Sequence, residues 1–63
     1  MKTHHLIAVA QDLGRKAFEN RLKRQHSLDL NLLELCTGKE KKLELKLQSN
    51  WYVGWDLANL RSS

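Results

Sequence analysis

The feature that most constrains this chain is a stripe of large apolar residues near its C-terminal end. Leu43, Leu47, Trp51 and Trp55 recur at every fourth position, which is the spacing that places side chains on one face of an α-helix. Gly54 lies beside both tryptophans, although a glycine costs about 1 kcal/mol of helix stability relative to alanine. A glycine in this place indicates that another backbone comes close. The sequence therefore predicts a long final helix that packs tightly against a neighbour.

The first part of the chain provides a matching surface of small residues. Ala10, Gly14 and Ala17 follow one another at helical spacing, and we expect this helix to cover residues 4–24. If the small residues of this first helix pack against Gly54, the first and the final helix come into close contact. The residues expected to form the packing surface or a dimer seam are Leu6, Leu13, Phe18, Leu43, Leu47, Trp51, Gly54 and Trp55.

The middle of the chain allows two interpretations. Leucines alternate with other residues on both sides of the segment TGKEK, which is typical of a β-hairpin over residues 28–48. However, Leu, Glu and Lys dominate this region, which has no Val or Ile, and this composition favours helix. We expect a short helix from Ser27 to Cys36 that is ended by Gly38. An α+β fold with a β-hairpin remains the alternative.

The length of the chain limits the size of its core. A chain of 63 residues forms at most one small domain and buries only about 60% of the surface that its unfolded form exposes. The single Cys36 cannot form an internal disulfide. We expect an all-α domain over residues 1–63, an antiparallel hairpin of helices at 4–24 and 39–60 with a short helix or loop between them. A homodimer would complete the core by covering Leu28, Leu30, Leu32, Leu33 and Leu35.

The positive charge is concentrated in the first segment. The net charge is +4, and residues 1–26 contain six Lys or Arg against two acidic residues, whereas the rest balances. This asymmetry hints at a polyanionic partner such as nucleic acid. Tyr52 points away from the tryptophan face and is the best candidate for an exposed aromatic contact. Lys2 contributes to the excess, and the residues expected to contact a polyanion are Arg15, Lys16, Arg21, Lys23 and Arg24.

No sequence motif points to catalysis or to a cofactor. The chain has no phosphate-binding glycine loop, no G-x-S-x-G segment and no paired zinc motif, and nothing orients a base toward the Cys36 thiol. The longest apolar run, Leu6 to Ala10, is far shorter than the roughly 20 residues that span a bilayer. We expect a non-enzymatic cytoplasmic protein with no cofactor, no metal and no membrane contact.

The spacing of Trp51, Gly54, Trp55 and Ala58, a W-x-x-G-W-x-x-A pattern, resembles the C-terminal helix of the ribosome modulation factor and its small relatives. These are two-helix proteins that bind ribosomes in resting bacteria. The likeness covers only this segment, and Thr37 follows the cysteine where those proteins have a proline. It implies close packing of a helix pair, with ribosome binding as an alternative function.

A broader resemblance covers nearly the whole chain. The opening MKTHHLIAVAQDLGRKAFENRLKRQ and the ending WYVGWDLANL resemble the small early proteins encoded in the exo–xis region of lambdoid bacteriophages. This resemblance implies a non-enzymatic accessory protein that is made early in infection in the bacterial cytoplasm. Such a protein would bind a host or phage macromolecule and favour lytic development. The group provides no catalytic or binding residues to transfer.

Overall fold

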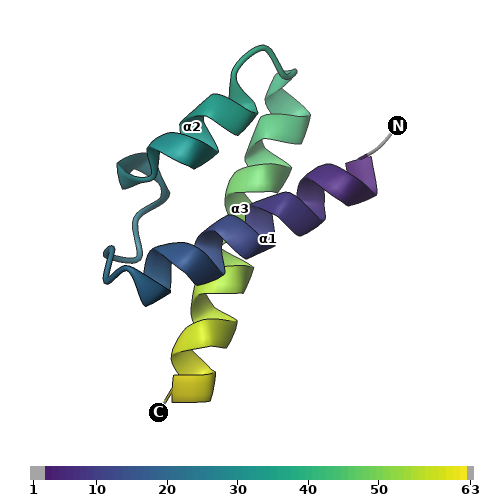
Figure 1. Cartoon of the computed structure of the whole chain (residues 1–63). Coiled ribbons are helices and arrows are strands. Elements are labelled where there is room, and N and C mark those ends of the chain that lie inside the picture. Colours follow the sequence, from purple (N-terminus) through teal and green to yellow (C-terminus); the bar gives the residue numbers. More distant parts are fainter. Residues whose placement is uncertain (1–2, 63) are drawn as a thin grey trace.

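The computed structural model describes residues 3–62, and these residues fold into three α-helices and one short 3₁₀ turn (Figure 1). No strand occurs within that range, so the all-α expectation is confirmed. The β-hairpin alternative over residues 28–48 is wrong, because helical segments occupy most of that region. In order along the chain, the elements are α1 (Thr3–Glu19), η1 (His26–Leu28), α2 (Leu30–Cys36) and α3 (Lys41–Ser62).

The two long helices, α1 and α3, cross with their chains running in the same general direction, and α2, which lies to one side of the crossing, runs back from the end of α1 to the beginning of α3 (Figure 1). Their contacts advance together along both helices. Gln11 Nε2 donates a hydrogen bond to Asn50 Oδ1 at 2.8 Å, and further along the ring of Phe18 meets Trp55 edge-on with centroids 5.2 Å apart. The topology therefore differs from the expected antiparallel hairpin, because α2 reverses the chain before α3 begins.

The closest approach of α1 and α3 is at two glycines. A Cβ atom built on Gly14 would overlap the carbonyl oxygen of Trp51, and one built on Gly54 would overlap the carbonyl oxygen of Gln11. Only glycine can occupy such positions, because any side chain would push the two backbones apart. The close approach predicted at these glycines is confirmed.

Trp51 lies at the centre of the core with none of its surface exposed. Around it are Leu47, Ala10 and Ala17, all buried, so the predicted core role of the Trp51 face is confirmed. Leu32 is also buried in the monomer. Four further expected seam residues, Leu6, Leu13, Leu43 and Trp55, are partly buried against this core together with Leu35. Phe18, the last of the expected set, is half-buried.

The first helix is shorter than expected and ends at Glu19. Arg21 takes a left-handed conformation with φ of 65°. The N–H of Leu22 donates to the carbonyl of Ala17, and that of Arg21 donates to the carbonyl of Phe18, both at 2.9 Å. This pair of hydrogen bonds is the Schellman motif, which ends many helices and usually has glycine where Arg21 stands.

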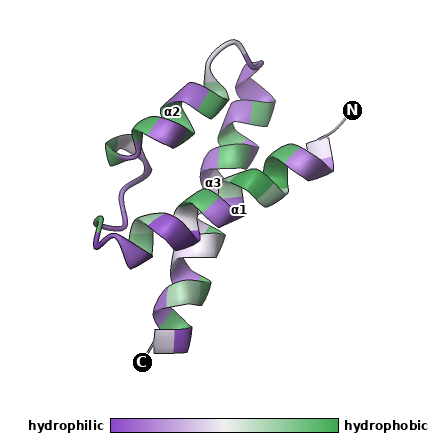
Figure 2. Cartoon of the chain, in the orientation of Figure 1, coloured by the Kyte–Doolittle hydropathy of each residue, from purple (hydrophilic) through white to green (hydrophobic). Residues whose placement is uncertain are grey.

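The short helix α2 begins at Leu30, not at Ser27. Its N-cap is Asp29, whose Oδ1 accepts from the N–H of Asn31 at 2.9 Å. It ends at Cys36, and Gly38 has a φ of 81°, so the predicted glycine stop is confirmed. Figure 2 shows that the segment between α1 and α2 is mostly hydrophilic, whereas hydrophobic residues recur along all three helices.

Candidate interaction surface

Two residues of the expected polyanion contact, Arg15 and Lys16, lie on α1 and are paired with acids. Arg15 donates to Asp12 at 2.5 Å and to Glu19 at 2.9 Å, and the Lys16 ammonium is 3.2 Å from Asp12. The hydrogen bond from Arg15, followed by that from Lys16, lowers the pKa of the Asp12 carboxyl. The positive charge of this face of α1 is therefore largely balanced within the helix.

Arg24 connects the loop after α1 to the third helix. Its guanidinium donates to both carboxylate oxygens of Asp56, at 2.7 and 2.8 Å, and lies 4.6 Å from the centre of the Tyr52 ring. The hydrogen bond from Arg24 lowers the pKa of the Asp56 carboxyl. Such a two-pronged pair fixes geometry as well as charge, so Arg24 has a structural role in the monomer.

Arg21 and Lys23 are exposed in the loop after α1, and neither has an ion pair to any residue of the described range 3–62. Only two of the five expected cations therefore carry unneutralised charge, because the other three are paired with acidic neighbours. Lys2 lies outside the described residues.

Tyr52 is less available than its position on the helix suggests. It is half-buried, its hydroxyl accepts from the backbone N–H of His26 at 3.3 Å, and it lies 2.9 Å from Nδ1 of the same histidine. The indole N–H of Trp55 donates to the carbonyl of Leu22 at 3.1 Å. The polar groups of Tyr52 and Trp55 thus form hydrogen bonds within the chain. This arrangement argues against Tyr52 as an exposed platform for base stacking.

The most important polar residue that sequence reasoning missed is Asp29. Its carboxylate is buried, and its Oδ2 accepts the indole N–H of Trp51 at 2.8 Å while Oδ1 caps α2. An aspartate before an apolar run is a recognised signal for a helix start, so the cap was open to prediction. The bond to Trp51 was not, because the two residues are far apart in the sequence.

The groups that could do chemistry are placed unfavourably for it. Cys36 is buried, and burial, with a smaller effect of the Glu44 charge, raises the pKa of its thiol. The thiol therefore stays protonated at neutral pH and is a weak nucleophile. Across residues 3–62, no three His, Cys, Asp or Glu side chains gather closely enough to hold a metal ion. None of the helices in this range combines the length and apolarity needed to cross a bilayer.

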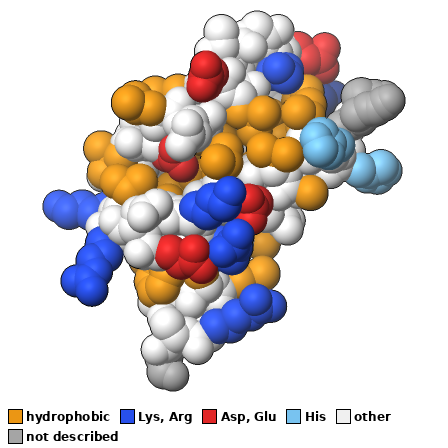
Figure 3. Space-filling view, viewed as in Figure 1, with side chains coloured by type: hydrophobic (Ala, Val, Ile, Leu, Met, Phe, Trp, Pro, Cys, Tyr) orange, Lys and Arg blue, Asp and Glu red, His pale blue; other side chains and the backbone are white. Residues whose placement is uncertain are grey.

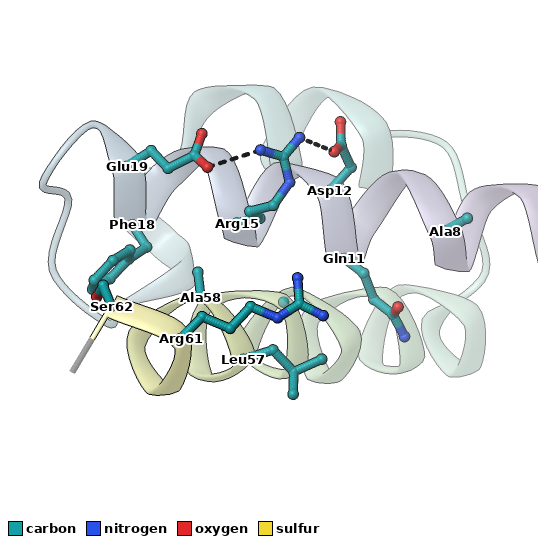
Figure 4. Close-up of a pocket in the computed structure, with 11 residues that line it drawn as sticks. Ala8, Gln11, Asp12, Arg15, Phe18, Glu19, Leu57, Ala58, Arg61 and Ser62 are labelled. Carbon is teal, nitrogen blue, oxygen red and sulfur yellow. Dashed lines mark hydrogen bonds and ion pairs between the residues drawn. The ribbon is translucent and has the colours of Figure 1, made fainter.

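A groove of about 480 Å³ lies between α1 and the C-terminal half of α3 (Figure 4). We call it the α1–α3 groove. Its apolar wall is formed by Ala8, Phe18, Gly54, Leu57 and Ala58, and its polar rim by Gln11, Asp12, Arg15, Glu19, Arg61 and Ser62.

One face of α3 beside this groove is apolar and exposed. Val53, Leu57 and Leu60 are 41%, 47% and 70% exposed, and their spacing places them in one line along the helix. We call these residues the α3 stripe. Because the opposite face of α3 already packs on α1 through Leu47 and Trp51, this helix is apolar on two sides. A helix of this kind has a face that is not used by its own fold.

A second exposed apolar surface lies on η1 and α2. Leu28, Leu30 and Leu33 are 45%, 76% and 44% exposed, and we call them the leucine patch. Figure 3 shows hydrophobic side chains spread over the α2 side of the molecule, with basic side chains extending from the same edge.

Comparisons of this chain with protein-family models, with curated proteins and with solved structures find no match.

Proposed function

We propose that this chain is a non-enzymatic accessory protein that acts by binding a host or phage macromolecule, chiefly a protein. The supporting observation is the presence of two exposed apolar surfaces, the α3 stripe and the leucine patch, on so small a chain. Contiguous apolar surface of this kind is typical of interaction sites. The buried, protonated state of Cys36 fits a function without thiol chemistry.

The biological setting of this proposal comes from the resemblance to the small early proteins of lambdoid phages. In that setting the protein works in the cytoplasm of an infected bacterium and favours lytic development. A regulator of this type needs only to occupy a surface on its target. The resemblance and the exposed apolar surfaces are thus mutually consistent.

The leucine patch supports self-association into a homodimer. Leu28, Leu30 and Leu33 are exposed, whereas Leu32 is already used inside the monomer. A symmetric dimer would bring the same patch together from both copies, as isologous interfaces do. Sedimentation equilibrium should show a dimer that Leu30→Glu converts to a monomer, while Leu45→Glu, at an exposed position on α3, leaves the dimer intact. A monomeric parent chain would contradict this part of the proposal.

The alternative function is binding of nucleic acid or of the ribosome. The observation in its favour is that Arg21 and Lys23 are exposed and carry no ion pair within the described part of the chain. Binding of this kind weakens steeply with salt, because each neutralised phosphate releases counterions. Replacing both residues with Ala should then reduce the affinity and the salt dependence together.

One experiment separates the two classes of partner. The tagged chain is used to recover partners from bacterial lysate, with and without nuclease, at low and at high salt. Recovery of a protein after nuclease and high salt is the result expected for the proposed function. Recovery only of ribosomes or nucleic acid, lost with nuclease and salt, would replace the proposal with the alternative.

A further inference from the structure

We infer that the α3 stripe and the adjoining α1–α3 groove form a docking site for an acidic amphipathic helix of a partner protein. This inference rests on the proposed function, because it names the chemistry of the partner segment that the protein would bind. It is carried by three features of the described residues: the line of apolar side chains on α3, the groove beside it, and the sign of the unneutralised charge around both.

The apolar side chains have the spacing with which one helix recognises another. Val53, Leu57 and Leu60 stand at positions i, i+4 and i+7, the pattern of anchors seen where an amphipathic helix lies along a groove or a second helix. All three are substantially exposed. Leu57 belongs both to this line and to the wall of the groove, so the two features form one continuous surface.

One side of the groove is formed by α1 and the other by α3, and no residue of α2 lines it. α2 joins the beginning of α3, whereas the C-terminal half of α3 continues past its crossing with α1 (Figure 1). Phe18 and Ala58 form apolar walls in the space that remains (Figure 4). A partner helix laid along Leu57 would therefore contact both α1 and α3, and it would cover apolar surface that the chain itself leaves exposed.

The charge around this surface favours an acidic partner. Lys42 and Lys46 lie on the same outward side of α3 as the stripe, since they precede Val53 by eleven and seven residues, about three and two helical turns. Arg61 lies along the groove (Figure 4). None of these three cations has an ion pair to another residue in the range 3–62.

The acidic residues near the surface are already engaged. Asp12 and Glu19 on the rim of the groove are bound to Arg15, and Asp56 is bound to Arg24. The unneutralised charge beside the stripe is therefore positive. Complementary charge at the rim of an apolar contact speeds association and selects the partner, so carboxylates on both flanks of the incoming helix fit this site.

Two other occupants fit less well. Single-stranded nucleic acid binds to proteins through aromatic side chains on which its bases stack. The α3 stripe is aliphatic, and Trp51 is fully buried. A second copy of the chain would bring the same cations, such as Lys46, to the same interface, where like charges disfavour pairing. The stripe is therefore assigned to a different protein and the leucine patch to self-association.

The test uses the full chain and a pair of synthetic helical peptides of about 20 residues. One peptide has Leu at positions i, i+3, i+4 and i+7 and Glu on its other face, and the second has Lys in place of every Glu. Each is titrated into the ¹⁵N-labelled chain, and amide shifts are followed by NMR. We expect the Glu peptide to bind and to shift the amides of Val53, Leu57 and Leu60, while the Lys peptide does not bind.

Three variants locate the binding energy. Leu57→Glu should weaken binding of the Glu peptide by about tenfold or more, because a half-exposed leucine loses its apolar contact and a repelling charge is added. Leu30→Glu, in the leucine patch, should leave the affinity unchanged. Arg61→Glu should also weaken binding, and it alters charge at an exposed position without disturbing the core. Circular dichroism shows whether each variant is folded. If Leu57→Glu is unfolded, the effect of Arg61→Glu on peptide affinity decides whether the docking site exists.

Several results would overturn the inference. Equal binding of both peptides, shifts confined to the leucine patch, or displacement of the Glu peptide by a single-stranded oligonucleotide would each contradict it. The lysate experiment keeps the two proposals apart. A protein partner that is still captured by the Leu57→Glu chain would refute the docking site and leave the proposed function standing. Failure of the parent chain to capture any protein would refute the function, and the peptide titration would still decide whether the surface has the stated preference.

Discussion

Asp29 and Trp51 connect the short central helix to the core. The Asp29 carboxylate accepts the indole N–H of Trp51 at 2.8 Å, and its other oxygen accepts from the backbone of Asn31 at 2.9 Å. One buried side chain therefore satisfies the only polar atom of the central tryptophan side chain and starts α2. This arrangement fixes α2 against the helix pair.

Replacing Asp29 with Ala should lower the free energy of unfolding by about 1–3 kcal/mol, because the buried indole N–H of Trp51 loses its acceptor. Loss of the N-cap adds to this effect. Asp29→Asn should cost less, since one oxygen remains to serve one of the two donors. Urea unfolding followed by circular dichroism gives both values. If the two variants were as stable as the parent chain, the Asp29 bond would not contribute to the fold.

Gly54→Ala should destabilise the chain by about 1–3 kcal/mol or more, because the added methyl group overlaps the Gln11 carbonyl and forces α1 and α3 apart. This cost opposes the gain of about 1 kcal/mol that alanine brings to a helix in place of glycine. Ser49→Ala, at an exposed position of the same helix, should change stability by less than about 0.5 kcal/mol. A Gly54→Ala chain with a higher thermal midpoint than the parent would show that the helices do not meet as described.

Arg21→Gly should stabilise the chain by about 1 kcal/mol, because glycine adopts the left-handed conformation at the end of α1 without steric cost. Lys23→Gly is the matched control. It removes the same charge from the same loop, but Arg21 is the only non-glycine residue in the range 3–62 with a positive φ. Lys23→Gly should therefore be neutral or slightly destabilising. Equal effects of the two substitutions in thermal unfolding would indicate that charge, not backbone conformation, is responsible.

The Arg24–Asp56 pair should make stability sensitive to acid. The pKa of Asp56 in the folded chain is lowered from the usual 3.8 by the hydrogen bond from Arg24, so the pair stabilises the fold above that value. The contribution is lost as the pH falls through the lower, folded-state pKa. Between about pH 5 and pH 2, the thermal midpoint of the Asp56→Asn variant should fall less than that of the parent chain. It should keep part of that drop, because the pKa of Asp12 is also lowered. An unchanged acid profile would contradict a role for this pair.

The helical fold and the glycine contact could be predicted from the sequence because both rest on local spacing. The four-residue recurrence of Leu47 and Trp51 gave the core face of α3, and Gly54 marked the close approach. The direction of α3 relative to α1 could not be predicted, because it depends on whether the Leu-rich middle folds into a reversing helix. Helix spacing gives a buried face but not the orientation of the helix that covers it.

Pairing between distant residues was also beyond the sequence. Arg24 looked like part of a basic cluster, but folding places it against Asp56. Asp29 looked like one more charge of the balanced half, but folding buries it beside Trp51. The α3 stripe was not predicted, because the four-residue spacing of the tryptophan face identifies only one side of a helix that is apolar on two sides.

We propose that the outward face of α3 is the surface that binds another protein. A photoreactive benzoylphenylalanine, placed in turn at Leu57, Leu30 and Lys23, tests it in bacterial cells that express the chain. We expect crosslinks to a different protein from Leu57 and crosslinks to a second copy of the chain from Leu30. Crosslinks to RNA or DNA from Lys23, with none to protein from Leu57, would contradict this proposal. The binding surface would then be the loop after α1 that carries Arg21 and Lys23.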